Sequence, residues 1–196
     1  MYKILKGVLL AAVPLLLLQQ LALAQQPPPP PDATVDASVV IQAPGPSCTA
    51  GTPTALYLGT VTRTSSSTAQ WVEVDEVDGT VDTSADLAEP TDHAVGHIQI
   101  DVENSSSLTV TVTFPSGLDN TAGPGYTNLT YTGAWAVSST STSGYTTISG
   151  TSDTQSSLSG SVTRHYRFGG RVGDITNSIA ADTYDGTIDL SISCSA

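Results

Sequence analysis

Few residues in this chain have side chains suited to catalysis. Histidine occurs only at His93, His97 and His165, and none of the three stands in a recognisable motif. A serine or cysteine nucleophile needs a nearby base, and the base needs a third group that orients it. Serine is abundant, but no Gly-x-Ser-x-Gly elbow and no phosphate-binding loop occur. The sequence therefore predicts no catalytic residues, and a secreted hydrolase is the least favoured class of function.

Metal binding has two candidate locations. His93 and His97 are four residues apart, but they straddle Gly96 at the start of a predicted strand, where this spacing has no special geometry. Seven acidic residues with little periodicity follow one another in an exposed loop or ragged hairpin: Asp75, Glu76, Asp78, Asp82, Asp86, Glu89 and Asp92. Carboxylates beside a glycine turn can bind calcium, but the EF-hand spacing with its terminal glutamate is missing. We predict no metal site and no cofactor, and calcium binding by this acidic loop is an alternative.

Aromatic rings could instead form a platform on which sugars stack. The candidates are Trp71, Tyr126, Tyr131, Trp135, Tyr145 and Tyr166. In a protein built of packed sheets, Trp and Tyr more often cover the margins of the core. Glycan binding is therefore a second alternative, beside calcium, for a monomeric surface module.

The charge of the chain excludes one class of partner. The formal net charge is −12, with 18 acidic residues against six lysines and arginines. Nucleic acids and anionic membranes bind basic patches, which this composition does not offer. We expect no nucleic-acid partner.

The first 31 residues have the composition of an export signal and a linker. Residues 1–24 begin with Lys3 and Lys6, continue with an apolar core and end in the small-x-small sequence Ala22-Leu23-Ala24. This order is typical of a cleaved signal peptide, and the apolar core is short for the alternative, a membrane anchor. Residues 25–31 contain five prolines and predict an extended polyproline spacer. We expect a secreted protein.

The two cysteines, Cys48 and Cys194, both lie in the exported part of the chain. A single pair in an oxidising compartment predicts one disulfide. This bond would close a loop that contains nearly the whole domain, which the sequence places at residues 48–196.

The body of the chain predicts strands throughout and no helix. Apolar residues alternate with polar ones, the period of a strand with one buried face, at 97–102, 108–114 and 187–193. Further strands are expected at 54–61, 70–77, 129–137, 145–148, 162–168 and 171–175, with a turn at Gly169-Gly170. In the last segment, Ile188, Leu190 and Ile192 share one face. The turn signals recur often enough for an all-β sandwich.

One more strand is expected ahead of the body, within residues 32–43. Ala33, Val35, Ala37, Val39 and Ile41 lie on one face, and the Pro44-Gly45-Pro46 break separates them from the body. A strand set apart by a linker and a break can pair with its own domain or with a neighbouring copy.

Two stretches of the body resemble a bacterial secreted domain family of unknown function, the DUF4402 group. The first is Thr54-Ala55-Leu56-Tyr57-Leu58-Gly59-Thr60-Val61, and the second is Phe168-Gly169-Gly170-Arg171-Val172 followed by Asp182 to Leu190. That group is similar in layout to spore coat protein U domains and to pilins of the chaperone-usher type.

The resemblance implies an immunoglobulin-like β-sandwich that lacks one strand and polymerises by donor-strand complementation. Ala33, Val35, Ala37, Val39 and Ile41 would be the donor strand, and Ile188, Leu190 and Ile192 would line the acceptor groove. The partners would be copies of the same chain, a periplasmic chaperone and an outer-membrane usher, and the location a cell-surface fimbria. In many such pilins the disulfide joins the first strand of the body to the second. Residues 98–102, where the second cysteine would fall, contain none, so Cys48 would have to reach Cys194.

Overall fold

The computed structural model describes residues 45–62, 67–121 and 128–196, and within them the protein is all-β. The twelve strands are β1 (Ser47–Ala50), β2 (Gln70–Val74), β3 (Val81–Thr83), β4 (Gly96–Glu103), β5 (Ser107–Thr113), β6 (Gly117–Asn120), β7 (Leu129–Ser138), β8 (Thr146–Thr147), β9 (Ser152–Gln155), β10 (Val162–Ile175), β11 (Tyr184–Asp185) and β12 (Asp189–Ser195). No membrane-spanning helix is found in the described part of the chain.

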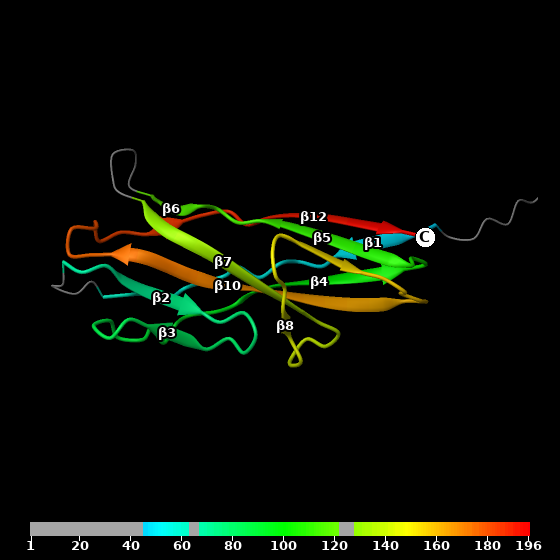
Figure 1. The fold of residues 1–196 in the computed structure, drawn as a ribbon, viewed down its shortest axis with the longest axis horizontal. Coiled ribbons are helices and arrows are strands. Elements are labelled where there is room, and N and C mark those ends of the chain that lie inside the picture. Colours follow the sequence, from blue (N-terminus) through cyan, green and yellow to red (C-terminus); the bar gives the residue numbers. More distant parts are fainter. Residues whose placement is uncertain (1–44, 63–66, 122–127) are drawn as a thin grey trace, which may run out of the picture. The chain divides into compact units, whose positions relative to one another are not determined.

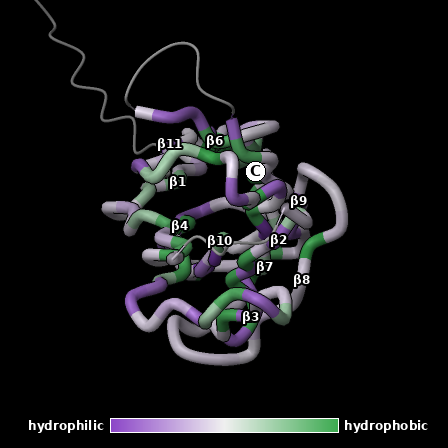
Figure 2. The backbone as a smooth tube through the Cα atoms, turned by 90° about the vertical axis from the view of Figure 1, so that its left-hand side faces the viewer, coloured by the Kyte–Doolittle hydropathy of each residue, from purple (hydrophilic) through white to green (hydrophobic). Residues whose placement is uncertain are grey.

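The strands form two antiparallel sheets (Figure 1). The larger sheet has nine strands, with the order β1-β4-β10-β7-β6-β11, and β2, β3 and β8 are attached beside this path. The smaller sheet has the order β12-β5-β9. Seen from the end, β6 and β11 lie at one margin and β3 at the opposite margin (Figure 2). In the two strand orders, β1 is a terminal strand of the larger sheet and β12 is a terminal strand of the smaller sheet.

The alternation read in the sequence produces the core between the sheets. In β4, Ile98, Ile100 and Val102 are at most 5 % exposed, and the polar residues between them are half-buried. The partner face is supplied by Leu108, Val110 and Val112 of β5, each at most 1 % exposed. Aromatic rings of β7 and β10 complete this core: Trp135, Tyr166 and Phe168. The period-2 pattern thus predicted these strands and their buried faces correctly.

A second apolar cluster lies at the other end of the nine-stranded sheet. It contains Val72 of β2, Leu129 and Tyr131 of β7, and Val172 of β10. The partly buried residues that pack against it come mainly from loops and short strands: Leu56, Leu58, Val61, Val81, Phe114, Leu118 and Tyr184. Strands β5 and β12 of the smaller sheet pack against the first core, so loops supply much of the cover over this second cluster.

The prediction of a turn at Gly169-Gly170 is wrong, because β10 continues through both glycines as one strand of 14 residues. A Cβ on Gly169 would lie 2.2 Å from the carbonyl oxygen of Val74, and one on Gly170 would lie 2.4 Å from that of Thr132. Gly170 also has a φ of 137°, which side chains rarely tolerate. The glycine pair therefore allows β2 and β7 to approach β10 closely from both sides.

The buried hydroxyl of Tyr131 donates a hydrogen bond of 2.7 Å to the carbonyl oxygen of Gly169. Burial raises the pKa of Tyr131, so the phenol keeps its proton and remains a donor. We expect Tyr131→Phe to lower the free energy of unfolding by about 1 kcal/mol, measured by urea denaturation. Tyr57, which is 47 % exposed, supplies the control, and Tyr57→Phe should change this free energy by less than about 0.5 kcal/mol. Equal effects of the two substitutions would contradict this account.

The segment at 54–61, expected as a strand, is also different in the structure. It forms only two isolated bridges, Thr54 with His97 and Tyr57 with Ala94. The strand expected at 145–148 is reduced to the two residues of β8. The acidic run at 75–92 contains the short strand β3, which pairs with β2. The sequence predicted an exposed loop or a ragged hairpin for this run, and the structure has the hairpin.

Candidate functional site

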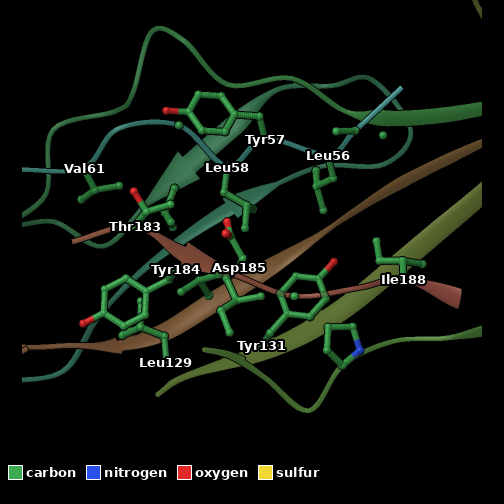
Figure 3. A pocket seen from close by; sticks show the side chains of 18 of the residues that line it. Leu56, Tyr57, Leu58, Val61, Leu129, Tyr131, Thr183, Tyr184, Asp185 and Ile188 are labelled. Atoms are coloured by element: carbon green, nitrogen blue, oxygen red, sulfur yellow. The ribbon is translucent and has the colours of Figure 1, made fainter. Parts of the chain in front are cut away.

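A groove of about 830 Å³ opens beside the second apolar cluster. One wall is the segment 53–61, and the opposite wall is the segment 179–190, which includes β11 and the start of β12. Leu129 and Tyr131 of β7 and Val172 of β10 lie on its floor. Leu56 and Leu58 point toward this floor, whereas Tyr57 between them points away (Figure 3). The lining is mainly apolar, and it presents uncovered hydrophobic side chains along two backbone segments.

The last strand, β12, is incompletely covered along the side that faces the core. Leu190 pairs with Val112 and Ile192 with Val110 in the β5–β12 register. The two valines are at most 1 % exposed, but Leu190 and Ile192 are only half-buried. Among the described residues, β12 has β5 as its strand partner and its other edge is unpaired. An unpaired edge with half-exposed aliphatic residues is a template for a further strand.

The terminal strand of the other sheet is open in the same way. In β1, Cys48 pairs with Val102 and Ala50 with Ile100, so Cys48 and Ala50 face the core. Val102 and Ile100 are fully buried, yet Ala50 is exposed. Core-facing residues are thus incompletely covered on the terminal strands of both sheets.

The predicted disulfide lies four residues beyond Leu190, the residue of β12 that lines the groove. Cys48 of β1 is bonded to Cys194 of β12, with 5.9 Å between the Cα atoms. This confirms the pairing expected from the sequence and indicates an oxidising compartment. Because the bond joins the terminal strands of the two sheets, it fixes their separation at one end.

A carboxylate holds the wall 53–61 in place. Asp92 accepts hydrogen bonds from the Thr60 backbone N–H at 2.9 Å, from the Thr60 hydroxyl at 2.7 Å and from the Tyr57 hydroxyl at 3.4 Å. The turn between these residues needs Gly59, whose φ is 93° and where a Cβ would lie 2.4 Å from Pro90. Asp92 is far from this wall in the sequence, so no local pattern indicates the contact.

We expect Asp92→Ala to loosen this wall. The Thr60 amide should exchange its hydrogen about tenfold faster at neutral pH, as expected for the loss of a charge-assisted bond. Hydrogen–deuterium exchange measures this, and Asp86→Ala, an exposed acid of the same loop, is the control. Exchange at Thr60 that is equal in the two variants would contradict the assignment.

The same contact has a defined pH dependence. The Thr60 N–H and then the Thr60 hydroxyl hold the pKa of Asp92 below its ordinary value. The contribution to stability is therefore present above about pH 3.9 and is lost as pH falls through the lower folded-state pKa.

The sequence-predicted site residues are brought together only in part. Ile188 and Leu190 line the groove, and Ile192 packs against the main core between the groove and the disulfide. The donor residues Ala33, Val35, Ala37, Val39 and Ile41 lie outside the described residues. Three residues of the opposite wall and of the floor were not expected as site residues: Leu56, Leu58 and Leu129. Tyr131 of the floor was a candidate only for glycan binding.

The residues proposed for calcium or glycan binding have other roles in the structure. Asp75 accepts hydrogen bonds from the N–H groups of Val77 and Asp78, and Asp78 accepts two from Thr80. Four of the six candidate aromatic residues are at most 6 % exposed and belong to the interior: Tyr131, Trp135, Tyr145 and Tyr166. Trp71 is covered by the guanidinium of Arg171 at 4.0 Å, and Tyr126 lies outside the described residues. No group of three or more potential metal ligands occurs within the described ranges.

Comparison of the chain with protein-family models, with curated proteins and with solved structures finds no match. The argument for function therefore rests on the geometry of the groove and on the sequence of the chain.

Proposed function

We propose that the protein is the structural subunit of a surface fimbria or filament and that it polymerises by donor-strand complementation. The observation that carries the proposal is the apolar groove between residues 53–61 and 179–190, which adjoins the unpaired edge of β12, where Leu190 and Ile192 are only half-buried. Strand addition to such an edge supplies backbone hydrogen bonds for affinity and side-chain contacts for fit. In this account the domain is an immunoglobulin-like sandwich that receives its last strand from another copy.

The occupant that fits this groove is the segment Ala33–Ile41 of the same chain. It places five apolar residues on one face, as a strand between two core-facing edges requires. Its nine residues would span about 30 Å when extended, and the wall formed by residues 53–61 is also nine residues long. Asp36 within the segment and Asp32 just before it alternate with the apolar positions and would face solvent.

The direction of the chain favours pairing between copies. Residues 32–43 precede β1, so they join the body at Ser47, next to the disulfide of Cys48. To enter its own groove, the segment must reverse direction within residues 42–46. To enter the groove of a second copy it needs no reversal, and it would then run antiparallel to β12. Each copy would offer a segment at one end and a groove at the other, a heterologous contact that builds an open filament.

The far edge of the smaller sheet is protected against the same kind of pairing. β9 carries Asp153, whose carboxylate accepts a hydrogen bond of 2.8 Å from the hydroxyl of the buried Tyr166. An inward-facing charge on an edge strand hinders the addition of another strand. The core-facing residues of β12 from Leu190 onward are Leu, Ile and Cys, without a charge. The contrast supports β12 as the edge used for assembly.

We expect Leu190→Arg to prevent polymerisation, because a charge in the groove would be buried without a partner. The matched control is Ser191→Arg, an exposed position of the same strand that should leave assembly unchanged. Light scattering gives the mass of each variant, and the thermal unfolding midpoint shows whether Leu190→Arg still folds. Filaments of equal mass from a folded Leu190→Arg variant would contradict the proposal.

A further inference from the structure

A pair of histidines lies where the groove wall is attached to the nine-stranded sheet. His97 of β4 and His165 of β10 lie with their rings stacked, and their centroids are 5.4 Å apart. The Nε2 atom of His97 is 3.2 Å from the Nδ1 atom of His165. Two facing ring nitrogens at this distance share one proton, since one must donate and the other must accept. A second proton would set two cationic N–H donors against each other.

The charged groups around the pair affect the two rings differently. Arg167 lies opposite His97 in the β4–β10 register, whereas the Asp101 carboxylate interacts with His165. Tyr145, ahead of β8, lies under the Arg167 guanidinium, and Glu76, from the loop after β2, accepts a bond from Thr147. On β7, the neighbour of His165 is the uncharged Ser138. The charge of Arg167 therefore makes a proton on the His97 ring less favourable.

The backbone of His97 is also the attachment point of the wall. The Thr54 N–H donates to the His97 carbonyl at 2.8 Å, and the His97 N–H donates to the Thr54 carbonyl at 3.1 Å. The next bridge along the wall joins Tyr57 to Ala94. Repulsion of the His97 ring from His165 would therefore strain His97, whose backbone forms the bridge to Thr54.

We propose that the His97–His165 pair is an acid-sensitive latch that holds the wall 53–61 against β4 at neutral pH and releases it in mild acid. Since the wall borders the groove, release would weaken strand capture, a consequence that rests on the proposed function. Burial, then the charge of His165, then that of Arg167 hold the pKa of His97 below its ordinary value. Stability from the neutral ring is therefore present above about pH 6.5 and is lost as pH falls through the lower folded-state pKa.

Hydrogen–deuterium exchange of the full chain tests the latch. Between pH 7.5 and 5.0, protection of residues 53–61, corrected for the intrinsic pH dependence of exchange, should decline. Between about pH 6.5 and the lower folded-state pKa it should fall by up to about tenfold per pH unit, the slope for uptake of one proton on opening, and below that pKa it should level off. Residues 107–113 of β5 are the internal reference and should not change. His97→Gln should abolish the decline, and the matched variant His93→Gln should retain it, because His93 bonds to Pro90 and Gly79 instead.

A second measurement separates the latch from the proposed function. Light scattering at pH 7.5 and 5.0 should show filaments that shorten in acid for the natural chain and for His93→Gln but not for His97→Gln. If filaments are absent even at pH 7.5, the proposed function is wrong, and the exchange measurement still decides the latch. Protection of residues 53–61 that is constant with pH, or that falls equally in His97→Gln, would overturn the latch.

Discussion

A chain that lacks Asp32–Gln42 is expected to lose the ability to form filaments and to become a less stable monomer. The groove would then have no strand to cover Leu190, Ile192 and the floor. Burial of Val35, Val39 and Ile41 is worth about 1.5–3 kcal/mol for each side chain, so the loss should be several kcal/mol. Light scattering reports the mass, and denaturant unfolding reports the stability.

A synthetic peptide of residues 32–42 is expected to restore the stability of the shortened chain. The control is the same peptide with Val35→Asp and Val39→Asp, which keeps the length but places charges in the groove. If the shortened chain still forms filaments, or if both peptides stabilise it equally, strand exchange is not the basis of assembly.

Loss of the disulfide is the second large expected effect. Cys48 and Cys194 are separated by 146 residues, and for such a loop the chain-entropy model gives about 5 kcal/mol. This is comparable to the whole stability of many domains, which is about 5–15 kcal/mol. We expect the double variant Cys48→Ser, Cys194→Ser to unfold at a much lower urea concentration, and reduction of the natural protein should reproduce its midpoint.

The disulfide also has a local role, because it joins β1 to β12, the strand that carries Leu190 and Ile192. The double variant should therefore lose filament assembly under conditions where it is still folded. A change in unfolding free energy below about 1 kcal/mol, together with normal filaments, would contradict both roles.

The sequence predicted the parts of the fold that a local pattern specifies. The alternation at 97–102, 108–114 and 187–193 identified β4, β5 and β12, because a strand with one buried face needs this period. The pairing of Cys48 with Cys194 required only that two cysteines share an oxidising compartment. The strands are specified by the alternation of neighbouring residues, and the disulfide is specified by the presence of a single pair of cysteines.

The groove could be predicted only on the β12 side. The apolar residues of the opposite wall predict a strand, but this wall is held mainly by Asp92 and by two bridges, one to His97 of β4 and one to Ala94 just before β4. The continuity of β10 through Gly169-Gly170 was missed because glycine pairs usually mark turns, whereas here they allow close approach of β2 and β7. Both features depend on contacts between residues that are distant in the sequence.

The most direct test of strand exchange is to find which copy holds the segment Ala33–Ile41. A photoreactive residue at position 39 can be placed in an unlabelled chain and refolded, with the disulfide intact, together with ¹⁵N-labelled chains. After irradiation and proteolysis, mass spectrometry identifies the residues joined and the copy from which each came. We predict links from position 39 of one copy to the groove walls, residues 53–61 and 179–190, of another. Links confined to a single copy, or to surfaces outside the groove, would contradict the account.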